Sequence, residues 1–204
     1  GEPMRPGDFY ELSRYLALRL EDAIQGGSGE PLIPVFLAHP VDIPKAESGQ
    51  GPRAALYLHR IIPSSTYREA GVRIQSAADP ALPGRVSRSA LWLELRFVFM
   101  VIEATSQEEL GAIAAAVEFL HSNALLSVED MEACLAKELS IELGELPLEL
   151  VEDAGLWQEL GFSRHHLGVS FKVTLPAVAR PGEEVERVVE REISLEQVLE
   201  KERK

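Results

Sequence analysis

The chain has 204 residues with 33 acidic and 20 basic side chains, which gives a formal net charge of −13 at pH 7. This acidic balance argues against partners that are nucleic acids or anionic membranes, because both require clustered lysine and arginine. The single cysteine, Cys134, cannot form an intrachain disulfide, and no apolar run reaches the roughly 18 residues of a membrane span. We therefore expect a cytoplasmic protein with one main core.

The N-terminal residues predict a helix followed by an extended segment. Apolar side chains recur at helical spacing from Leu12 to Ile24, and Asp8 is the predicted N-cap. The glycine-rich residues 26–29 are expected to end this helix. Residues 32–38 are apolar and predicted to lie near a sheet edge, because their proline content disfavours a central strand.

The next segments are predicted to be loop, strand and loop. Residues 39–53 are rich in proline and glycine and poor in apolar side chains, so we expect a loop. Residues 54–62 alternate in the manner of a strand. Residues 63–88 are polar and interrupted by prolines, and loops of this length in compact domains are usually functional or disordered.

The strongest signal lies in residues 91–102. Apolar side chains occupy every second position and so share one face of a strand: Leu91, Leu93, Leu95, Phe97, Phe99 and Val101. The other face begins mixed, with Trp92, Glu94 and Arg96, and then turns apolar. This pattern predicts a central strand that is covered on one side at its start and on both sides at its end.

The following residues predict a capped helix. Ser106 and Glu109 have the spacing of a capping box, with Ser106 as N-cap, and the helix is expected over residues 107–123. Its predicted core-facing stripe consists of Leu110, Ile113, Ala114, Val117, Leu120 and His121.

The remaining residues predict further short elements and a charged tail. In order, we expect a helix over 128–138, a strand over 139–143, a helix from Pro147 to Leu160 ended by Gly161, a core strand over 167–175, an exposed strand over 185–193 and a short helix over 194–204. The predicted fold class is α+β, a mostly antiparallel sheet packed by two or three helices. We expect a domain over residues 1–180 and a charged strand and helix extension over 181–204.

Candidate reactive groups do not converge in the sequence. His165 and His166 are adjacent, so in a strand they point to opposite faces and cannot readily chelate one metal ion. Cys134 is predicted to be a buried, inert thiol on a helix. Glu94 and Arg96 are expected to form an ion pair with a neighbouring strand or subunit rather than to act in catalysis. We therefore predict no catalytic residue, no cofactor and no metal.

Four segments resemble one known family. Residues 56–71 resemble its strand followed by Pro/Asn and Arg-Asn, and residues 91–99 (Leu-Trp-Leu-Glu-Leu-Arg-Phe-Val-Phe) resemble its Leu-x-Leu-x-Tyr strand. Residues 108–126 resemble its helix leading to a His-x-x-Pro-Val-Leu end. Leu156-Trp157 with residues 167–175 resembles its Leu-Trp … Ser-Val-x-Tyr close. The family is the cap, or tail-terminator, domain of extracellular contractile injection systems.

This resemblance covers roughly residues 8–180 and implies a structural, non-enzymatic protein. Members of the family form a hexameric ring on the distal end of the inner tube, stop its growth and help to anchor the last sheath layer. The implied partners are copies of the chain itself, the inner-tube protein and the sheath protein. The acidic tail after Ala179 has no counterpart in the family, and Ser64 and Ser65 stand where the family tends to have Asn.

Two sets of residues are predicted to contact partners. A basic set in and near residues 63–88 would dock on an acidic partner ring, the alternative being a solvated loop: Arg60, Arg68, Arg73, Arg85 and Arg88. An apolar set in the tail would add a strand to the final sheath ring: Val185, Val189 and Ile193. The alternative for the tail is a hairpin with the strand over 167–175.

Other classes of function stay open at this point. One is a non-catalytic adaptor or ligand-binding α+β domain, and a less favoured one is a phage tail-completion protein. A third is an enzyme whose site is assembled from dispersed residues such as His59, Glu94 and His121. A ring with an axial channel would favour the terminator, whereas a pocket of converging titratable groups would favour the enzyme.

Overall fold

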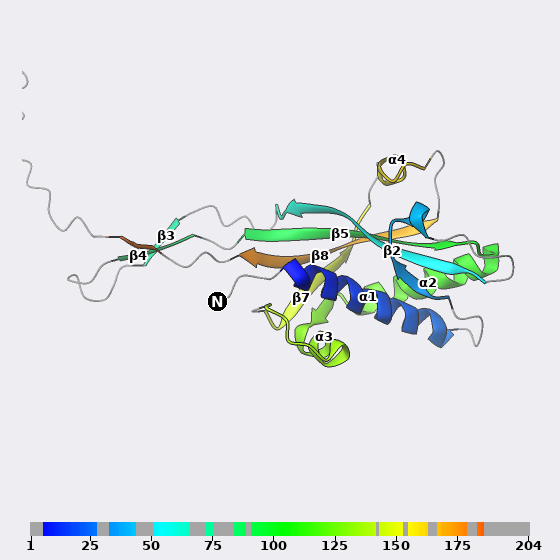
Figure 1. Cartoon of the computed structure of the whole chain (residues 1–204), viewed down its shortest axis with the longest axis horizontal. Coiled ribbons are helices and arrows are strands. Elements are labelled where there is room, and N and C mark those ends of the chain that lie inside the picture. The colour runs from blue at the N-terminus through cyan, green and yellow to red at the C-terminus, as the bar shows by residue number, and fades with distance from the viewer. Residues whose placement is uncertain are drawn as a thin grey trace, which may run out of the picture. The chain divides into compact units, whose positions relative to one another are not determined.

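A computed structural model describes residues 6–27, 33–43, 51–65, 72–75, 84–88, 91–141, 143–152, 155–162, 167–178 and 183–185. The chain divides into two compact units (Figure 1). The first unit comprises Gly1–Arg68 and Ala90–Ala179, and the second comprises Glu69–Ser89 and Arg180–Lys204. The predicted division at residue 180 stays a prediction.

The first unit contains a six-stranded sheet in the order β1-β2-β5-β8-β7-β6. Its strands are β1 (Val35–Leu37), β2 (Arg53–Pro63), β5 (Leu91–Ile102), β6 (Leu125–Ser127), β7 (Glu145–Leu150) and β8 (Gly168–Val178). Every neighbouring pair is antiparallel except β1 and β2, which run parallel. This sheet confirms the predicted α+β class.

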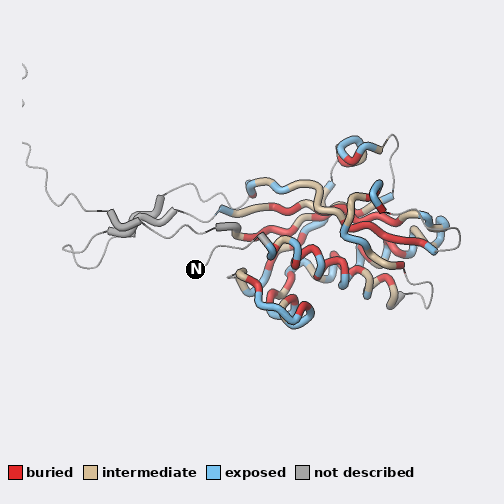
Figure 2. Tube along the Cα trace, viewed as in Figure 1, coloured by how far each residue is buried: buried red, intermediate tan, exposed pale blue. Residues whose placement is uncertain are grey.

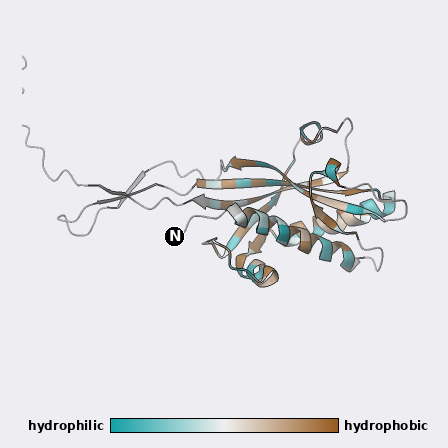
Figure 3. Ribbon diagram, in the orientation of Figure 1, coloured by the Kyte–Doolittle hydropathy of each residue, from teal (hydrophilic) through white to brown (hydrophobic). Residues whose placement is uncertain are grey.

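Helices cover the sheet unequally on its two faces. The helices α1 (Pro6–Gly27), α2 (Ser106–Ser122) and α3 (Val128–Leu135) pack on one face, where they share the main hydrophobic core with the strands (Figure 1). The short α4 (Leu156–Glu159) packs on the other face. Figure 3 shows that hydrophobic residues recur along the strands and that the helices carry more hydrophilic residues than the strands do. We call the two sides the helical face and the opposite face.

Strand β5 is central, as predicted, and lies between β2 and β8. On the helical face Leu95, Phe97 and Phe99 are fully buried (Figure 2), and the ring of Phe97 stacks on Phe171 of β8 with centroids 5.3 Å apart. On the opposite face Val98 is buried against α4. The predicted cover on both sides of the second half of β5 is therefore confirmed. At its start the prediction was wrong, because Leu91 is 49% exposed and Glu94 is buried among charged partners.

Helix α1 begins earlier than predicted. It starts at Pro6, so Asp8 lies within the first turn instead of capping it. The physical reason is that proline suits the first turn of a helix, where its missing N–H would have no partner. The helix ends at Gly27, inside the predicted glycine-rich stop.

Helix α2 corrects both the predicted cap and the predicted buried side. Thr105, one residue before the predicted Ser106, is the N-cap: its N–H donates to Glu108 Oε2 at 2.7 Å, and the Glu108 N–H donates to Thr105 Oγ1 at 3.4 Å. Leu110 is 60% exposed, and Ala114, Val117 and His121 are exposed as well. The buried side is Ala112, Ile113, Ala116, Phe119 and Leu120. Helix α2 packs against α1, and side-chain size at such a contact sets how closely two helices approach.

Residues 124–162 differ most from the prediction. The edge strand β6 was not predicted, α3 ends at Leu135 instead of 138, and the strand expected over 139–143 lies instead at Glu145–Leu150, where a helix was expected. Proline at position 147 is compatible with a strand here because the β7–β8 ladder begins only at Leu148. Helix α4 is a single turn, and Gly161 follows it at φ +76°, which confirms the predicted terminator.

The second unit is a three-stranded antiparallel sheet in the order β3-β4-β9. The strands are β3 (Val72–Gln75), β4 (Gly84–Arg88) and β9 (Glu183–Val185). The prediction of a structureless loop over 63–88 was therefore wrong, because strands this short give too few alternations to be recognised. The alternative of a hairpin between the tail and β8 does not hold for Glu183–Val185, which pair with β4. The predicted tail helix over 194–204 lies outside the described residues.

Candidate interaction surfaces

A buried charged group lies on the opposite face of the sheet. The carboxylate of Glu94 belongs to a side chain that is 4% exposed, and Ser64 Oγ donates to its Oε1 at 3.1 Å. Lys172 Nζ lies 3.5 Å from the same oxygen, and Arg96 Nη2 lies 3.7 Å from Oε2. Lys172 Nζ also lies 3.3 Å from Glu149 Oε2. We call Ser64, Glu94, Arg96, Glu149 and Lys172 the Glu94 cluster.

The backbone explains why this cluster assembles. Glu94 and Arg96 are two residues apart on β5 and so project from the same face, and the β5–β8 register places Lys172 opposite Arg96. Ser64 follows β2 directly, and its N–H donates to the carbonyl of Trp92 at 2.8 Å. The predicted ion pair between Glu94 and a neighbouring strand is therefore confirmed. The sequence does not identify Lys172 as this partner, because register between distant strands cannot be read from spacing.

The chemistry of the cluster is that of a structural ion group. A buried carboxylate is stable when cations and hydrogen-bond donors compensate its lost hydration, and Glu94 has both. The groups that compensate Glu94 are the hydroxyl of Ser64, the ammonium of Lys172 and the guanidinium of Arg96. The cluster therefore stiffens the sheet and places charged side chains on its opposite face.

Arg60 forms a second ion pair on this side of the molecule. It lies on β2 just after an irregularity in the β2–β5 register, between Leu58 and Arg60, and its guanidinium pairs with the carboxylate of Glu159 on α4. The pair connects α4 to the sheet. That Arg60 also contacts a partner protein stays a prediction.

The other predicted contact residues fall mainly in the second unit. Register places positions 73 and 85 on one face of the three-stranded sheet, and positions 88 and 185 on the other. Arg73, Arg85, Arg88 and Val185 are thus in one small sheet. Arg68, Val189 and Ile193 lie outside the described residues. Whether any of these residues contacts a partner stays a prediction.

The dispersed residues of the enzyme alternative do not converge. Glu94 lies on the opposite face, whereas His121 is exposed at the end of α2, which packs on the helical face. Among the described residues, no group of three His, Cys, Asp or Glu side chains is arranged to hold a metal ion. His165 and His166 are outside the described residues. Cys134 is exposed, which corrects the prediction of a buried thiol: α3 ends one residue later and turns its other side to the core.

The hydropathy of the helices and two cavities bear on the other classes of function. No helix within the described ranges is long and apolar enough to cross a bilayer. One cavity of about 300 Å³ lies between α1, β6 and α3, and another of about 260 Å³ lies at the end of β5 beside Phe162. Both are at or below the lower end of the range for small-molecule sites.

Comparisons with known proteins give one matching family and two solved structures. The family model described as the Pvc16 N-terminal domain matches residues 11–191. A cryo-EM structure of the PVC sheath/tube terminator of an extracellular contractile injection system, in the extended state, is 15% identical with a TM-score of 0.52, covering 98% of this chain and 71% of that one. The tube-terminating cap of the anti-feeding prophage is 15% identical with a TM-score of 0.49, covering 87% of this chain and 59% of that one. No curated protein matches the chain.

Proposed function

This chain belongs to the Pvc16 N-terminal domain family, and from that premise we propose that it is a structural protein that terminates the tube of a contractile injection particle. The observation that carries the proposal is the extent of the match, which spans residues 11–191. A fold shared with a sheath/tube terminator across 98% of the chain supports it. Fold alone does not fix function, so the proposal rests first on the family match.

The architecture suits a terminator. A protein that ends a tube must present a rigid surface to the last tube ring and must not offer an equivalent surface for another ring. A six-stranded sheet with three helices on one face and a compensated charge cluster on the other gives two chemically different sides. Such a subunit can present different chemistry to the tube on one side and to its surroundings on the other.

We further propose that the chain acts as a homo-oligomeric ring, with six copies as the expected number. Head-to-tail contacts generate a closed ring when the rotation between neighbours closes. A net charge of −13 per chain opposes self-association in dilute solution. The ring is therefore expected to form on the tube, in the cytoplasm where the particle is assembled.

Contacts with tube and sheath proteins are proposed for the second unit and the tail. Arginines at positions 73 and 85 share a sheet face and would pair with acidic side chains of a partner. Residues beyond β9 would extend a strand to the last sheath ring. Both contacts follow from charge and strand chemistry, and neither requires catalysis.

Cryo-microscopy of particles purified with and without this protein tests the proposal. With the protein present, density for it is expected at one end of each tube. Without it, tubes of uncontrolled length or particles with loose sheaths are expected, and supplying the wild-type chain should restore uniform length. Density for the protein distributed along the shaft, or tubes of unchanged length in its absence, would contradict a terminator.

A further inference from the structure

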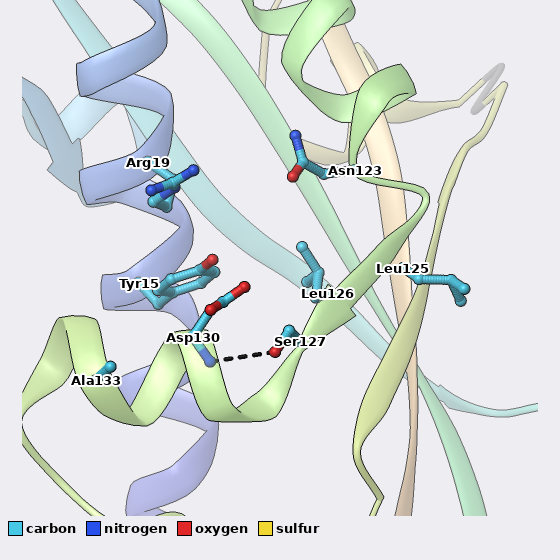
Figure 4. Close-up of a pocket in the computed structure, with 8 residues that line it drawn as sticks. All are labelled: Tyr15, Arg19, Asn123, Leu125, Leu126, Ser127, Asp130 and Ala133. Carbon is cyan, nitrogen blue, oxygen red and sulfur yellow. Dashed lines mark hydrogen bonds between the residues drawn. The ribbon is translucent and has the colours of Figure 1, made fainter.

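A polar pocket of about 300 Å³ lies on the helical side of the first unit (Figure 4). Helix α1 contributes Tyr15 and Arg19, the end of α2 contributes Asn123, and the β6–α3 junction contributes Ser127 and Asp130. In Figure 4 the side chains of Tyr15, Arg19 and Asp130 lie on one side of the space, and Asn123 lies across from them. We call this space the Tyr15 pocket.

Tyr15 is the central group of the pocket. Its side chain is packed into the core, with 5% of the residue exposed, and its hydroxyl lines the pocket. Burial raises the pKa of the phenol, Arg19 opposes this shift and Asp130 adds to it. The hydroxyl is therefore protonated at neutral pH and able to donate. A hydroxyl that lines a pocket is free to donate a hydrogen bond to an acceptor bound there.

Two opposite charges flank this hydroxyl without neutralising each other. The guanidinium of Arg19 lies over the ring of Phe119, with Cζ 6.0 Å from the centroid, and no ion pair joins it to Asp130 within the described part of the chain. Asp130 is held at the start of α3, where its N–H donates to Ser127 Oγ at 3.2 Å. A ligand with only a negative charge would be repelled by Asp130, and a ligand with only a positive charge would be repelled by Arg19.

We propose that the Tyr15 pocket binds a carboxylate that carries an N–H donor on the neighbouring carbon. The carboxylate would accept hydrogen bonds from Arg19 and from the Tyr15 hydroxyl, and the N–H group would donate to Asp130. Two sources share this chemistry: a free α-amino acid, whose donor is an ammonium, and the C-terminal residue of a polypeptide, whose donor is an amide. The volume suits one residue of this kind. The proposal does not rest on the terminator role.

Four small probes separate these sources when they are titrated into the full-length protein and followed by nuclear magnetic resonance of the backbone amides around Ser127 and Asp130. N-acetylglycine represents a chain end and glycine a free amino acid, whereas acetate lacks the N–H donor and glycinamide lacks the carboxylate. We expect N-acetylglycine or glycine to bind at least about tenfold more tightly than acetate and glycinamide. Tighter binding of N-acetylglycine assigns the pocket to a polypeptide end, and tighter binding of glycine assigns it to a free amino acid.

Substitutions test which groups are responsible. Tyr15→Phe removes only the hydroxyl and should weaken the preferred probe about tenfold, and Arg19→Gln should weaken it at least as much. Asp130→Asn should weaken the preferred probe while strengthening acetate. Arg14→Gln, on the same helix but outside the pocket, is the matched control and should leave the affinity for every probe unchanged.

Three outcomes would each overturn the proposal: equal binding of acetate and N-acetylglycine, no binding of any probe, or equal affinities for Tyr15→Phe and Arg14→Gln. Arg19 and Asp130 are exposed, so their variants keep the test valid if Tyr15→Phe misfolds.

Discussion

The two faces of strand β5 are buried to nearly the same degree but by different interactions. On the helical face, Phe97 and Phe99 are enclosed by helices and by Phe171 of the neighbouring strand. On the opposite face, Glu94 is almost as inaccessible, but it is enclosed by a hydroxyl, a guanidinium and an ammonium group. Alternating residues of one strand thus experience two different local environments.

The comparison teaches that burial alone does not identify what stabilises a position. An apolar side chain gains free energy from area removed from water, and its loss leaves a cavity. A buried carboxylate loses hydration and recovers it only through its partners, so its net contribution is small while its removal leaves those partners uncompensated. Helical-face variants should therefore respond to side-chain volume, and opposite-face variants should respond to charge balance.

The largest expected effect is on the helical face. Phe97→Ala should lower the free energy of unfolding by about 3–5 kcal/mol, because the stacked ring of Phe171 loses its partner and a cavity forms. Chemical denaturation of the purified chain measures this change. Phe97→Leu is the control and should cost clearly less because it keeps most of the volume. An unchanged denaturation midpoint for Phe97→Ala would mean that this face is not the main core.

The next effect is on the opposite face. Glu94→Ala should cost about 2 kcal/mol, because Lys172 and Arg96 lose the carboxylate that lies between them and Ser64 loses its hydrogen-bond acceptor. Glu94→Ala combined with Lys172→Met should recover part of this loss, since one of the two cations is removed. Denaturation of the single and double variants checks the coupling. If the two substitutions are simply additive, the cluster is not an interacting unit.

The same two faces explain what the sequence could and could not predict. Strand β5 was predictable because its alternation persists from Leu91 to Ile102 and its apolar second half anticipates α4. An ion pair between Glu94 and a neighbouring strand could be predicted. Its partner Lys172 could not, because the β5–β8 register depends on residues far apart in the chain. The Tyr15 pocket could not be predicted for the same reason.

Local rules failed where a residue type serves two structures equally well. Pro147 fits both the first turn of a helix and a strand residue without a ladder bond, and the structure uses it in β7. On α2, apolar side chains surround much of the helix, so the stripe through Leu110 competes with the one through Ala116. Packing against α1 selects the second.

A smaller effect tests how α2 is held on the helical face. Thr105→Ala should cost about 1 kcal/mol because it removes the side chain that accepts the Glu108 N–H. Ser106→Ala is the matched control, one residue further along, and should change stability by less than about 0.5 kcal/mol. Thermal unfolding of the two variants distinguishes them, and a larger loss for Ser106→Ala would restore the cap predicted from the sequence.

The smallest effect concerns a charge at the rim of the helical face, where Lys137 Nζ lies 2.9 Å from Glu11 Oε1 on α1. The hydrogen bond from Lys137 holds the pKa of Glu11 below its ordinary value of 4.5. A lowered carboxyl pKa contributes stability that is complete above the unfolded value and is lost as the pH falls through the folded value. The melting temperature of Lys137→Met should therefore lie slightly below that of the wild type at pH 7, and the difference should disappear as the pH falls below about 4.5.

Arg14→Met removes a cation that lies farther from Glu11, at 3.5 Å, so its melting temperature should depend on pH in the same way but less strongly. Because this pair is solvated and the Glu94 cluster is not, a difference for Lys137→Met as large as that for Glu94→Ala would remove the distinction between rim and buried charges.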